Sequence, residues 1–198
     1  NLFKIIMSIE QIYVKDVYDK IASSFSNTRY RPWSCVENFL DDIPKGSTIG
    51  DIGRGNGKNM LYRKDCINIG CDFSEGLVKI CNDKDLNVIT GDILNIPFTD
   101  NSFDYTICIA VIHHLDSEEK HIIAINQLMN ILKKGGKLLI TLWAFESDDY
   151  SKKKKFNKGH NFINFDKNER YYYIYDENML IQMLKNINYT YNYYWERG

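Results

Sequence analysis

The sequence lacks the features of membrane proteins and of secreted, disulfide-rich proteins. It has no apolar run close to the roughly 20 residues that a membrane-spanning helix needs. Residues 1–9 have neither the charged region nor the cleavage pattern of a signal peptide. The five cysteines are odd in number, scattered and without CxxC spacing, which argues against a disulfide framework and against a zinc site built by this chain. We therefore expect a protein without membrane or metal sites in a reducing compartment, the cytoplasm or the nucleus.

The sequence also has no large excess of positive or negative charge, because it contains 25 Lys and Arg and 26 Asp and Glu. Binding to a nucleic acid would therefore depend on a local basic patch and not on the overall field. One candidate is the lysine run 152–155, which can contact phosphates, although such runs are often only solvated segments. The length of 198 residues favours a single domain.

The apolar pattern predicts an α/β fold. Helical spacing around residues 14–25 and 36–40, separated by the turn 28–33, predicts an N-terminal helical cap over residues 1–45. Residues 46–146 form the expected core, in which β-like runs alternate with helical stretches and predict a Rossmann-like, mostly parallel sheet with helices on both faces. The expected strands are Thr48 to Ile52, Ile67 to Cys71, Asn87 to Thr90, Phe103 to Ile109 and Lys137 to Trp143.

Local signals predict where the helices begin and end. Ser74 can cap a helix that follows it, and Asp116 with Glu119 has capping-box spacing ahead of a second helix. Gly135-Gly136 is expected to terminate that second helix in the left-handed conformation.

Beyond the core, the apolar periodicity disappears over residues 147–170, which predicts an irregular insertion. Residues 171–198 are expected to form a helix near Glu177 to Lys185 and an aromatic strand, Tyr189 to Trp195.

A glycine-rich loop, residues 51–57, follows the first strand and is expected to precede a helix, at the edge where doubly wound sheets bind ligands. The dinucleotide fingerprint would need a third glycine where Lys58 stands. The P-loop needs four residues between its glycines and Ser or Thr after Lys, but three separate Gly53 from Gly57 and Asn59 follows Lys58. Asp51 at the start of the loop would repel a phosphate but can pair with an ammonium group.

Acidic residues follow three successive strands. Asp51 can pair with the ammonium of S-adenosylmethionine (SAM), Asp72 can accept both ribose hydroxyls, and Asp92 can accept from the adenine amino group. The alternative is that these carboxylates are helix caps and that Gly53, Gly55 and Gly57 are ordinary turn residues. Because an acidic residue follows each of the three successive strands, we favour a SAM site over this alternative.

Several strings are similar to those of a known family. They are Tyr13-Val14, Val17-Tyr18, Ile21-Ala22, Phe25-Ser26-Asn27-Thr28-Arg29-Tyr30-Arg31-Pro32-Trp33, the glycine loop, Ala110-Val111-Ile112-His113-His114, Trp143-Ala144-Phe145-Glu146 and the stretch from Arg170-Tyr171-Tyr172 to Tyr175. The chain resembles class I SAM-dependent methyltransferases and, more closely, the eukaryotic tRNA wobble-uridine carboxymethyl methyltransferases.

This resemblance implies transfer of a methyl group from SAM to the carboxylate of 5-carboxymethyluridine in tRNA. It also implies a small zinc-binding activator protein, which we expect to dock by strand addition along Asn87 to Thr90, at a sheet edge. Arg29 is expected to hold the acceptor carboxylate, with His113 or His114 beside it. Tyr18, Asn56, Phe73, Ser74, Ile93 and Ala110 are expected to complete the cofactor site, and Trp33 and Trp143 to contact substrate.

The chain departs from the family at four points. Arg54 replaces a usual Cys, Phe73 a frequent Arg and Tyr173 a usual His, and the family's Asn-Trp-Trp strand would follow Gly198, so the last strand of the seven-stranded type of sheet is expected to be missing. Two rivals stay open: a methyltransferase acting on a quinone or a free carboxylic acid, and a subunit that keeps the fold but has lost transfer activity.

Overall fold

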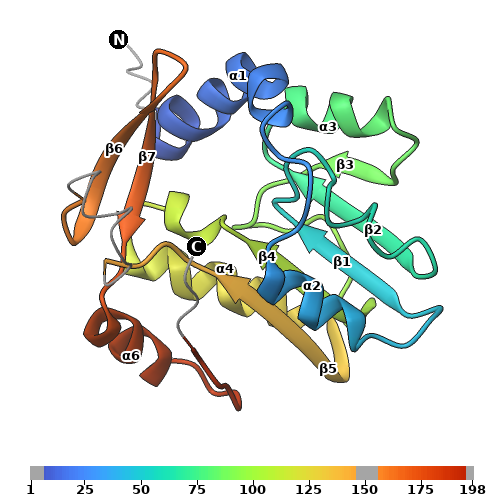
Figure 1. Cartoon of the computed structure of the whole chain (residues 1–198). Helices are drawn as coiled ribbons and strands as arrows, with labels where there is room; N and C mark the ends of the chain where they lie inside the picture. Colours follow the sequence, from blue (N-terminus) through green and yellow to red (C-terminus); the bar gives the residue numbers. More distant parts are fainter. Residues whose placement is uncertain (1–6, 146–155, 195–198) are drawn as a thin grey trace, which may run out of the picture.

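The computed structural model describes residues 7–145 and 156–194, and its centre is a parallel sheet (Figure 1). The order is β3-β2-β1-β4-β5, so the chain builds outward from β1 in one direction and then returns to build in the other. This order confirms the predicted Rossmann-like α/β fold. It also places a topological switch point between β1 and β4, where such sheets open a crevice at their carboxyl edge. The strands are β1 (Thr48–Ile52), β2 (Ile67–Asp72), β3 (Val88–Thr90), β4 (Phe103–Ile109) and β5 (Leu132–Thr141).

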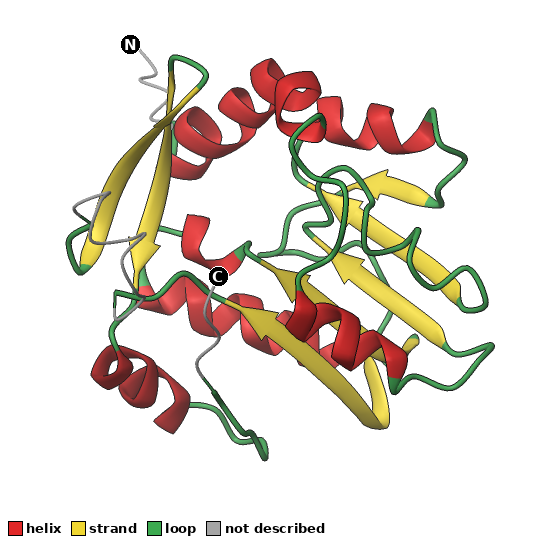
Figure 2. Ribbon diagram, viewed as in Figure 1, coloured by secondary structure: helices red, strands yellow, loops and turns green. Residues whose placement is uncertain are grey.

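Helices cover both faces of this sheet (Figure 2). Neighbouring residues of β4 point to opposite faces, and Ile107 packs in the cluster of α2, whereas Cys108 packs in the cluster of α4. The N-terminal cap consists of a π-helical turn η1 and helix α1, which lies beside α3. The bounds are η1 (Gln11–Lys15), α1 (Asp16–Ser26), α2 (Ser34–Asp41), α3 (Glu75–Asn82), α4 (Glu118–Asn130) and α6 (Glu177–Lys185). Within the described residues, no helix combines the length and the apolar character of a membrane span.

One of the two predicted helix starts is confirmed. The Ser74 hydroxyl accepts from the Leu77 N–H at 3.2 Å, as expected for the cap of α3. The predicted cap Asp116 is wrong, because Ser117 is extended and its hydroxyl accepts from the Lys120 N–H at 3.3 Å. Asp116 instead pairs with the Lys120 ammonium at 2.7 Å.

Two predictions based on glycine are also wrong. Helix α4 ends at Asn130, well before Gly135, because the following Leu132 is buried and pairs with Phe103 as part of β5. Gly135 adopts φ +83 at an irregularity inside that strand. After the glycine loop, residues 58–66 form turns and not a helix. Arg63 in this stretch donates to the Ile43 carbonyl at 2.8 Å and ties the turns to the segment after α2.

An antiparallel hairpin, β6 (Gly159–Phe165) and β7 (Asn168–Ile174), replaces much of the predicted irregular insertion. Asp166 and Lys167 at its tip have φ of +49 and +61, the left-handed pair that a two-residue hairpin turn requires. The sequence concealed this turn because neither residue is glycine. The hairpin packs on η1 and η2 (Ile112–His114), apart from the central sheet (Figure 1).

The C-terminal part is partly as predicted. The helix at Glu177 to Lys185 forms as expected. The expected strand Tyr189 to Trp195 does not form over residues 189–194, whose tyrosines are largely exposed, and Trp195 lies outside the described residues. The lysine run 152–155 lies outside them too.

Candidate active site

The three predicted acidic residues meet at the carboxyl rim of the sheet. Asp51 lies near the end of β1, Asp72 ends β2, and Asp92 follows β3, which pairs with β2. Because β1, β2 and β3 are parallel neighbours, the three side chains gather at one edge.

Asp51 is an unpaired carboxylate in the interior. It is 1% exposed, and neither of its oxygens has a hydrogen-bond partner within the described residues. Burial raises the pKa of Asp51 to about 7, against the opposing charge of Arg54. A buried carboxylate without a partner marks a site that a cationic or hydrogen-bonding ligand completes.

Asp72 ties the glycine loop to the start of α3. Its carboxylate accepts from the Gly55 N–H at 2.7 Å and from the Ser74 N–H at 2.9 Å. Burial raises the pKa of Asp72 to about 6, although these two hydrogen bonds oppose the rise. Each oxygen keeps a further lone pair, so the carboxylate can still accept from a diol.

The loop between them is built by residues that tolerate left-handed backbone, since Gly53, Gly55 and Gly57 all have positive φ. At Gly53 a side chain is also excluded by space, because a Cβ there would lie 2.3 Å from Val111 Cγ2. The Asn56 side chain fastens the loop to the N-terminal cap, because its amide donates to the Arg29 carbonyl at 2.9 Å. Asn56 does not line the small cavity at the rim that is described below.

Arg54, one of the departures from the family pattern, lies under the loop and does not line the cavity. Its side chain occupies the space that Gly70 leaves open, where a Cβ would lie 2.8 Å from Arg54 Cδ. The guanidinium contacts Met60 Sδ at 3.0 Å, and burial lowers the pKa of Arg54 while Asp51 opposes that effect. Its charge therefore compensates the acidic rim from below.

A small cavity of about 60 Å³ opens at this rim. It brings together five predicted residues: Gly53, Phe73, Asp92, Ile93 and His114. It also contains residues that the sequence reasoning missed: Glu10, Val14, Val111 and Leu115, of which the last two flank the predicted histidines. Ser74 does not line it, because its hydroxyl caps α3 and donates to Asp19 at 2.6 Å.

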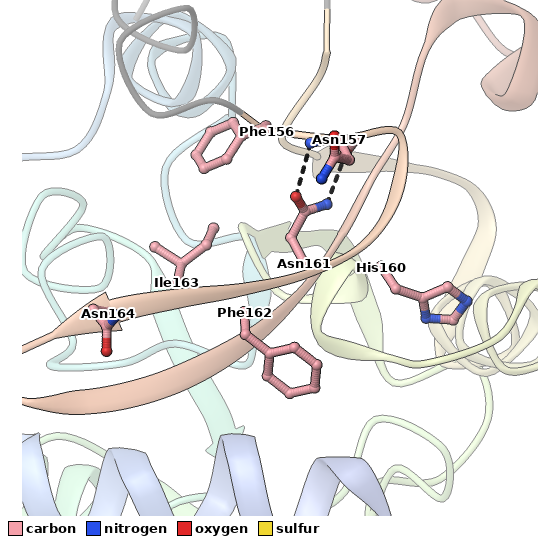
Figure 3. Close-up of a pocket in the computed structure, with 7 residues that line it drawn as sticks. All are labelled: Phe156, Asn157, His160, Asn161, Phe162, Ile163 and Asn164. Carbon is pink, nitrogen blue, oxygen red and sulfur yellow. Dashed lines mark hydrogen bonds between the residues drawn. The ribbon is translucent and has the colours of Figure 1, made fainter.

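A larger hollow of about 460 Å³ runs along β6 (Figure 3). Asn161 and Asn157 exchange two hydrogen bonds there, while Phe162 and Ile163 point to opposite sides of the strand (Figure 3). This hollow contains none of the acidic rim residues. The smaller cavity contains one of them, Asp92, whereas Asp51 and Asp72 do not line it but directly adjoin its lining residues Ile52 and Phe73 along the chain. We therefore assign the site to the smaller cavity at the acidic rim.

The hydrogen bonds of His114 determine its protonation. Nδ1 lies 2.7 Å from the Tyr171 carbonyl, which can only accept, so Nδ1 carries the proton. Nε2 therefore accepts from the Tyr18 hydroxyl at 3.1 Å, and the Tyr18 oxygen accepts from Arg170 Nη1 at 3.3 Å. Burial lowers the pKa of His114 to about 4, so the ring is neutral. Both nitrogens are engaged; His114 itself lines the cavity, whereas its partner Tyr18 does not.

His113 is packed more deeply, with a 1% exposed side chain. Its ring stacks on Tyr172 of β7 at 4.9 Å, and its Nδ1 has no partner in the described part of the chain. Burial lowers the pKa of His113 well below its ordinary value. The element that covers His113 is the hairpin, through Tyr172.

Three further predicted residues, Arg29, Trp33 and Trp143, do not line the cavity. The Arg29 guanidinium lies 4.9 Å from the Phe25 ring centroid, and Trp143 meets Tyr172 edge-on at 6.4 Å. Trp33 is half exposed and lies under the Lys58 ammonium at 5.3 Å.

Ala110 lies in the turn after β4 and has a strained backbone. It adopts φ +59, and its N–H donates to Thr141 Oγ1 at 2.9 Å. A residue with a Cβ rarely adopts this conformation, and such strain is concentrated at functional sites. The strained turn leads directly into η2, which carries the two histidines.

The comparisons with known proteins agree with this geometry. The family model described as "Methyltransferase domain" matches residues 50–140. The chain is 45% identical over 151 residues to a tRNA (carboxymethyluridine(34)-5-O)-methyltransferase of Xenopus tropicalis, covering 76% of this chain and 24% of that protein. It is 46% identical over 143 residues to the Arabidopsis thaliana protein of the same name, covering 72% and 35%. Against the Schizosaccharomyces pombe protein of that name it is 45% identical over 137 residues, covering 69% and 60%.

Solved structures share the fold. A SAM-dependent methyltransferase of Methanosarcina mazei matches with a TM-score of 0.67 at 16% identity, covering 79% of this chain and 84% of that one. A complex of the Haloferax volcanii Trm112 methyltransferase activator with a putative methyltransferase matches with a TM-score of 0.59 at 23% identity, covering 73% and 68%. The chain spans only a quarter to three fifths of the curated relatives named above. The chain belongs to the class I SAM-dependent methyltransferases, and its sequence is similar to those of the proteins named tRNA (carboxymethyluridine(34)-5-O)-methyltransferases.

Proposed function

We propose that this chain binds SAM at the acidic rim and methylates the carboxylate of 5-carboxymethyluridine at the wobble position of tRNA. The observation that carries the proposal is the buried, unpartnered Asp51 carboxylate beside Asp72, in a chain 45% identical to an enzyme named for this reaction. Asp51 would hold the ammonium of the cofactor, Asp72 the ribose hydroxyls and Asp92 the adenine amino group.

The chemistry of the donor set fits this cofactor. Phe73 and Ile93 line the cavity and supply apolar surface for a purine ring. The cavity of about 60 Å³ is smaller than the several hundred Å³ of a typical ligand site. Binding of the cofactor therefore requires some of the lining residues to move outward.

The acceptor needs no strong base. A carboxylate is ionised at neutral pH, and the neutral histidines at the site are not required to remove a proton. Held by Asp51, Asp72 and Asp92, SAM would supply a sulfonium methyl group to the carboxylate oxygen, and the electron pair of the broken carbon–sulfur bond would stay on sulfur, so that both charges would cancel. The protein's part is to hold the carboxylate in line and to exclude water, and Arg29 is our candidate for the holding group.

The partners follow from the edge of the sheet and from the relatives. Strand β3 pairs only with β2 in the described sheet, and Ile89 on it is 44% exposed. An open edge with an exposed apolar side chain suits strand addition by a small zinc-binding activator. The structural match to a methyltransferase in complex with an activator supports an activator as partner. We also propose that the protein acts in the cytoplasm or the nucleus. The lysine run 152–155 is our candidate for contact with the phosphates of the tRNA.

The direct test is methyl transfer from labelled SAM to tRNA that carries 5-carboxymethyluridine, with the activator protein present. We expect base-labile label in the tRNA, because the product is a methyl ester. The control is the same tRNA with unmodified uridine at that position, which should stay unlabelled. Label that appears only in a small-molecule fraction would reject the tRNA substrate, and the absence of SAM binding would favour an inactive subunit.

The affinity for SAM should rise with pH. The pKa of Asp51 is raised to about 7 and that of Asp72 to about 6, and only the ionised carboxylates bind an ammonium or accept two hydroxyls. Binding should therefore be weak at pH 6, tighten by roughly tenfold toward pH 8, and level off above that. Calorimetry at several pH values, repeated in buffers of different ionisation enthalpy, would measure the affinity and the proton release. Asp51→Asn should bind weakly and without the rise around pH 7; a flat profile for the unmodified chain would contradict the proposed role.

A further inference from the structure

Arg170 is a buried cation without an acidic partner in the part of the chain that the structure describes. It lies in β7 and is only 5% exposed. Its Nη1 donates to the Tyr18 hydroxyl, but its Nε is buried and has no hydrogen-bond partner among residues 7–145 and 156–194. None of the ion pairs within those residues includes it. Because an uncompensated buried charge is costly, such a group calls for an anion from outside the chain.

Aromatic rings enclose the guanidinium. Its central carbon lies 4.8 Å from the ring centroid of Phe165, 5.3 Å from that of Tyr172 and 5.8 Å from that of Tyr18. Ring faces attract a cation and exclude water, but they carry no charge that could neutralise it. The remaining donors of Arg170 therefore act in a dry environment, where hydrogen bonds to a carboxylate are strong.

This cage adjoins the cofactor cavity. Tyr18 connects Arg170 to His114, and His114 lines the cavity. Arg29 belongs to the same neighbourhood, because it lies over Phe25, whose ring meets Tyr18 edge-on at 5.2 Å. The Arg170 guanidinium thus contacts the Tyr18 hydroxyl directly, and Phe25 connects the Arg29 guanidinium to the Tyr18 ring.

We propose that Arg170 binds the carboxylate of the methyl acceptor, together with Arg29. This inference rests on the proposed function and deepens it, because it assigns a second acceptor-binding residue on the hairpin. A small planar carboxylate at the end of a flexible arm can enter the aromatic cage and accept from a guanidinium through both oxygens. A backbone phosphate is larger and more strongly hydrated, and it would remain at the surface.

The experiment compares two tRNAs in binding, without turnover and with the activator present. One carries 5-carboxymethyluridine at the wobble position, and the other carries 5-carbamoylmethyluridine, in which a neutral amide replaces the carboxylate. The variants are Arg170→Met, Arg170→Lys and, as a matched loss of one positive charge, Lys134→Met. Lys134 is exposed in β5, near the amino edge of the sheet. Calorimetry with SAM and a thermal melt accompany each variant.

We expect the unmodified chain and Lys134→Met to prefer the carboxylate tRNA. Arg170→Met should reduce this preference by at least about tenfold while leaving SAM affinity unchanged, and Arg170→Lys should lie between them. An Arg170→Met protein that folds and keeps the full preference overturns the proposal. Equal weakening toward both tRNAs also overturns it and assigns Arg170 to a phosphate. If Arg170→Met does not fold, Arg170→Lys provides the test. An Arg170→Lys protein with an unchanged preference for the carboxylate tRNA would show that the guanidinium group is not required, and the proposal would be wrong.

Failure of the broader proposal gives a different result. If the unmodified chain methylates no carboxymethyluridine tRNA, the proposed function is wrong whatever the variants do. If it methylates this tRNA and the Arg170 variants keep the full carboxylate preference, only the role of Arg170 is wrong.

Discussion

Asp72→Ala is expected to reduce the affinity for SAM by about 100-fold or more. The carboxylate would lose two hydrogen bonds to ribose hydroxyls, and each hydrogen bond to a charged group contributes about 1.5–3 kcal/mol. It would also lose the bonds from the Gly55 and Ser74 N–H groups, which hold the glycine loop against α3. Titration calorimetry of SAM into the folded variant measures the loss.

A carboxylate at the other edge of the sheet provides the control. Asp104 accepts from the Thr48 hydroxyl and N–H, and these bonds with Lys133 lower the pKa of Asp104 to about 2. Asp104→Ala should therefore lose stability but bind SAM normally. A SAM affinity of Asp72→Ala within threefold of the unmodified chain would show that the ribose is held elsewhere.

Gly53→Ala is expected to destabilise the fold by about 3 kcal/mol and to remove SAM binding. The backbone at this residue has φ +72, which costs a residue with a Cβ roughly 1–2 kcal/mol. The new Cβ would lie 2.3 Å from Val111 Cγ2, and such overpacking costs roughly 1–3 kcal/mol more. For a chain of this size, the melting temperature should fall by roughly 6–12 °C.

Gly135→Ala separates the two causes. Gly135 has φ +83, but a Cβ there meets no atom within 4 Å. This variant should show only the backbone cost of roughly 1–2 kcal/mol and should bind SAM normally. Equal melting temperatures and equal SAM affinities for the two variants would contradict the argument that Val111 excludes a side chain at Gly53.

The sequence predicted the parts of the site that follow one another along the chain. Asp51, Asp72 and Asp92 each come at the end of a strand, and parallel strands bring their ends to one edge. Ser74 was predicted as a cap because a hydroxyl before a helix has a local partner. Signals of this kind depend on a few neighbouring residues, so they can be read without the fold.

The parts that were missed depend on contacts between distant segments. Arg170 and Tyr172 meet Tyr18 and the histidines only because the hairpin β6–β7 packs on η1 and η2. The hairpin itself was hidden, since Asp166 and Lys167 give no strong turn signal. The end of α4 was misplaced for a related reason, because pairing of Leu132 with Phe103 outweighed the local preference of Gly135.

The sequence by itself determined the five strands of the central sheet, the glycine loop and the acidic residue at three of the strand ends, because periodicity and turn chemistry are local properties of the chain. The tertiary structure alone decided that Asp51 is buried without a partner, that His114 is neutral with both nitrogens engaged, and that Arg170 lies in an aromatic cage. Burial and protonation depend on which distant side chains exclude water from a group, and only the packed fold brings those side chains together.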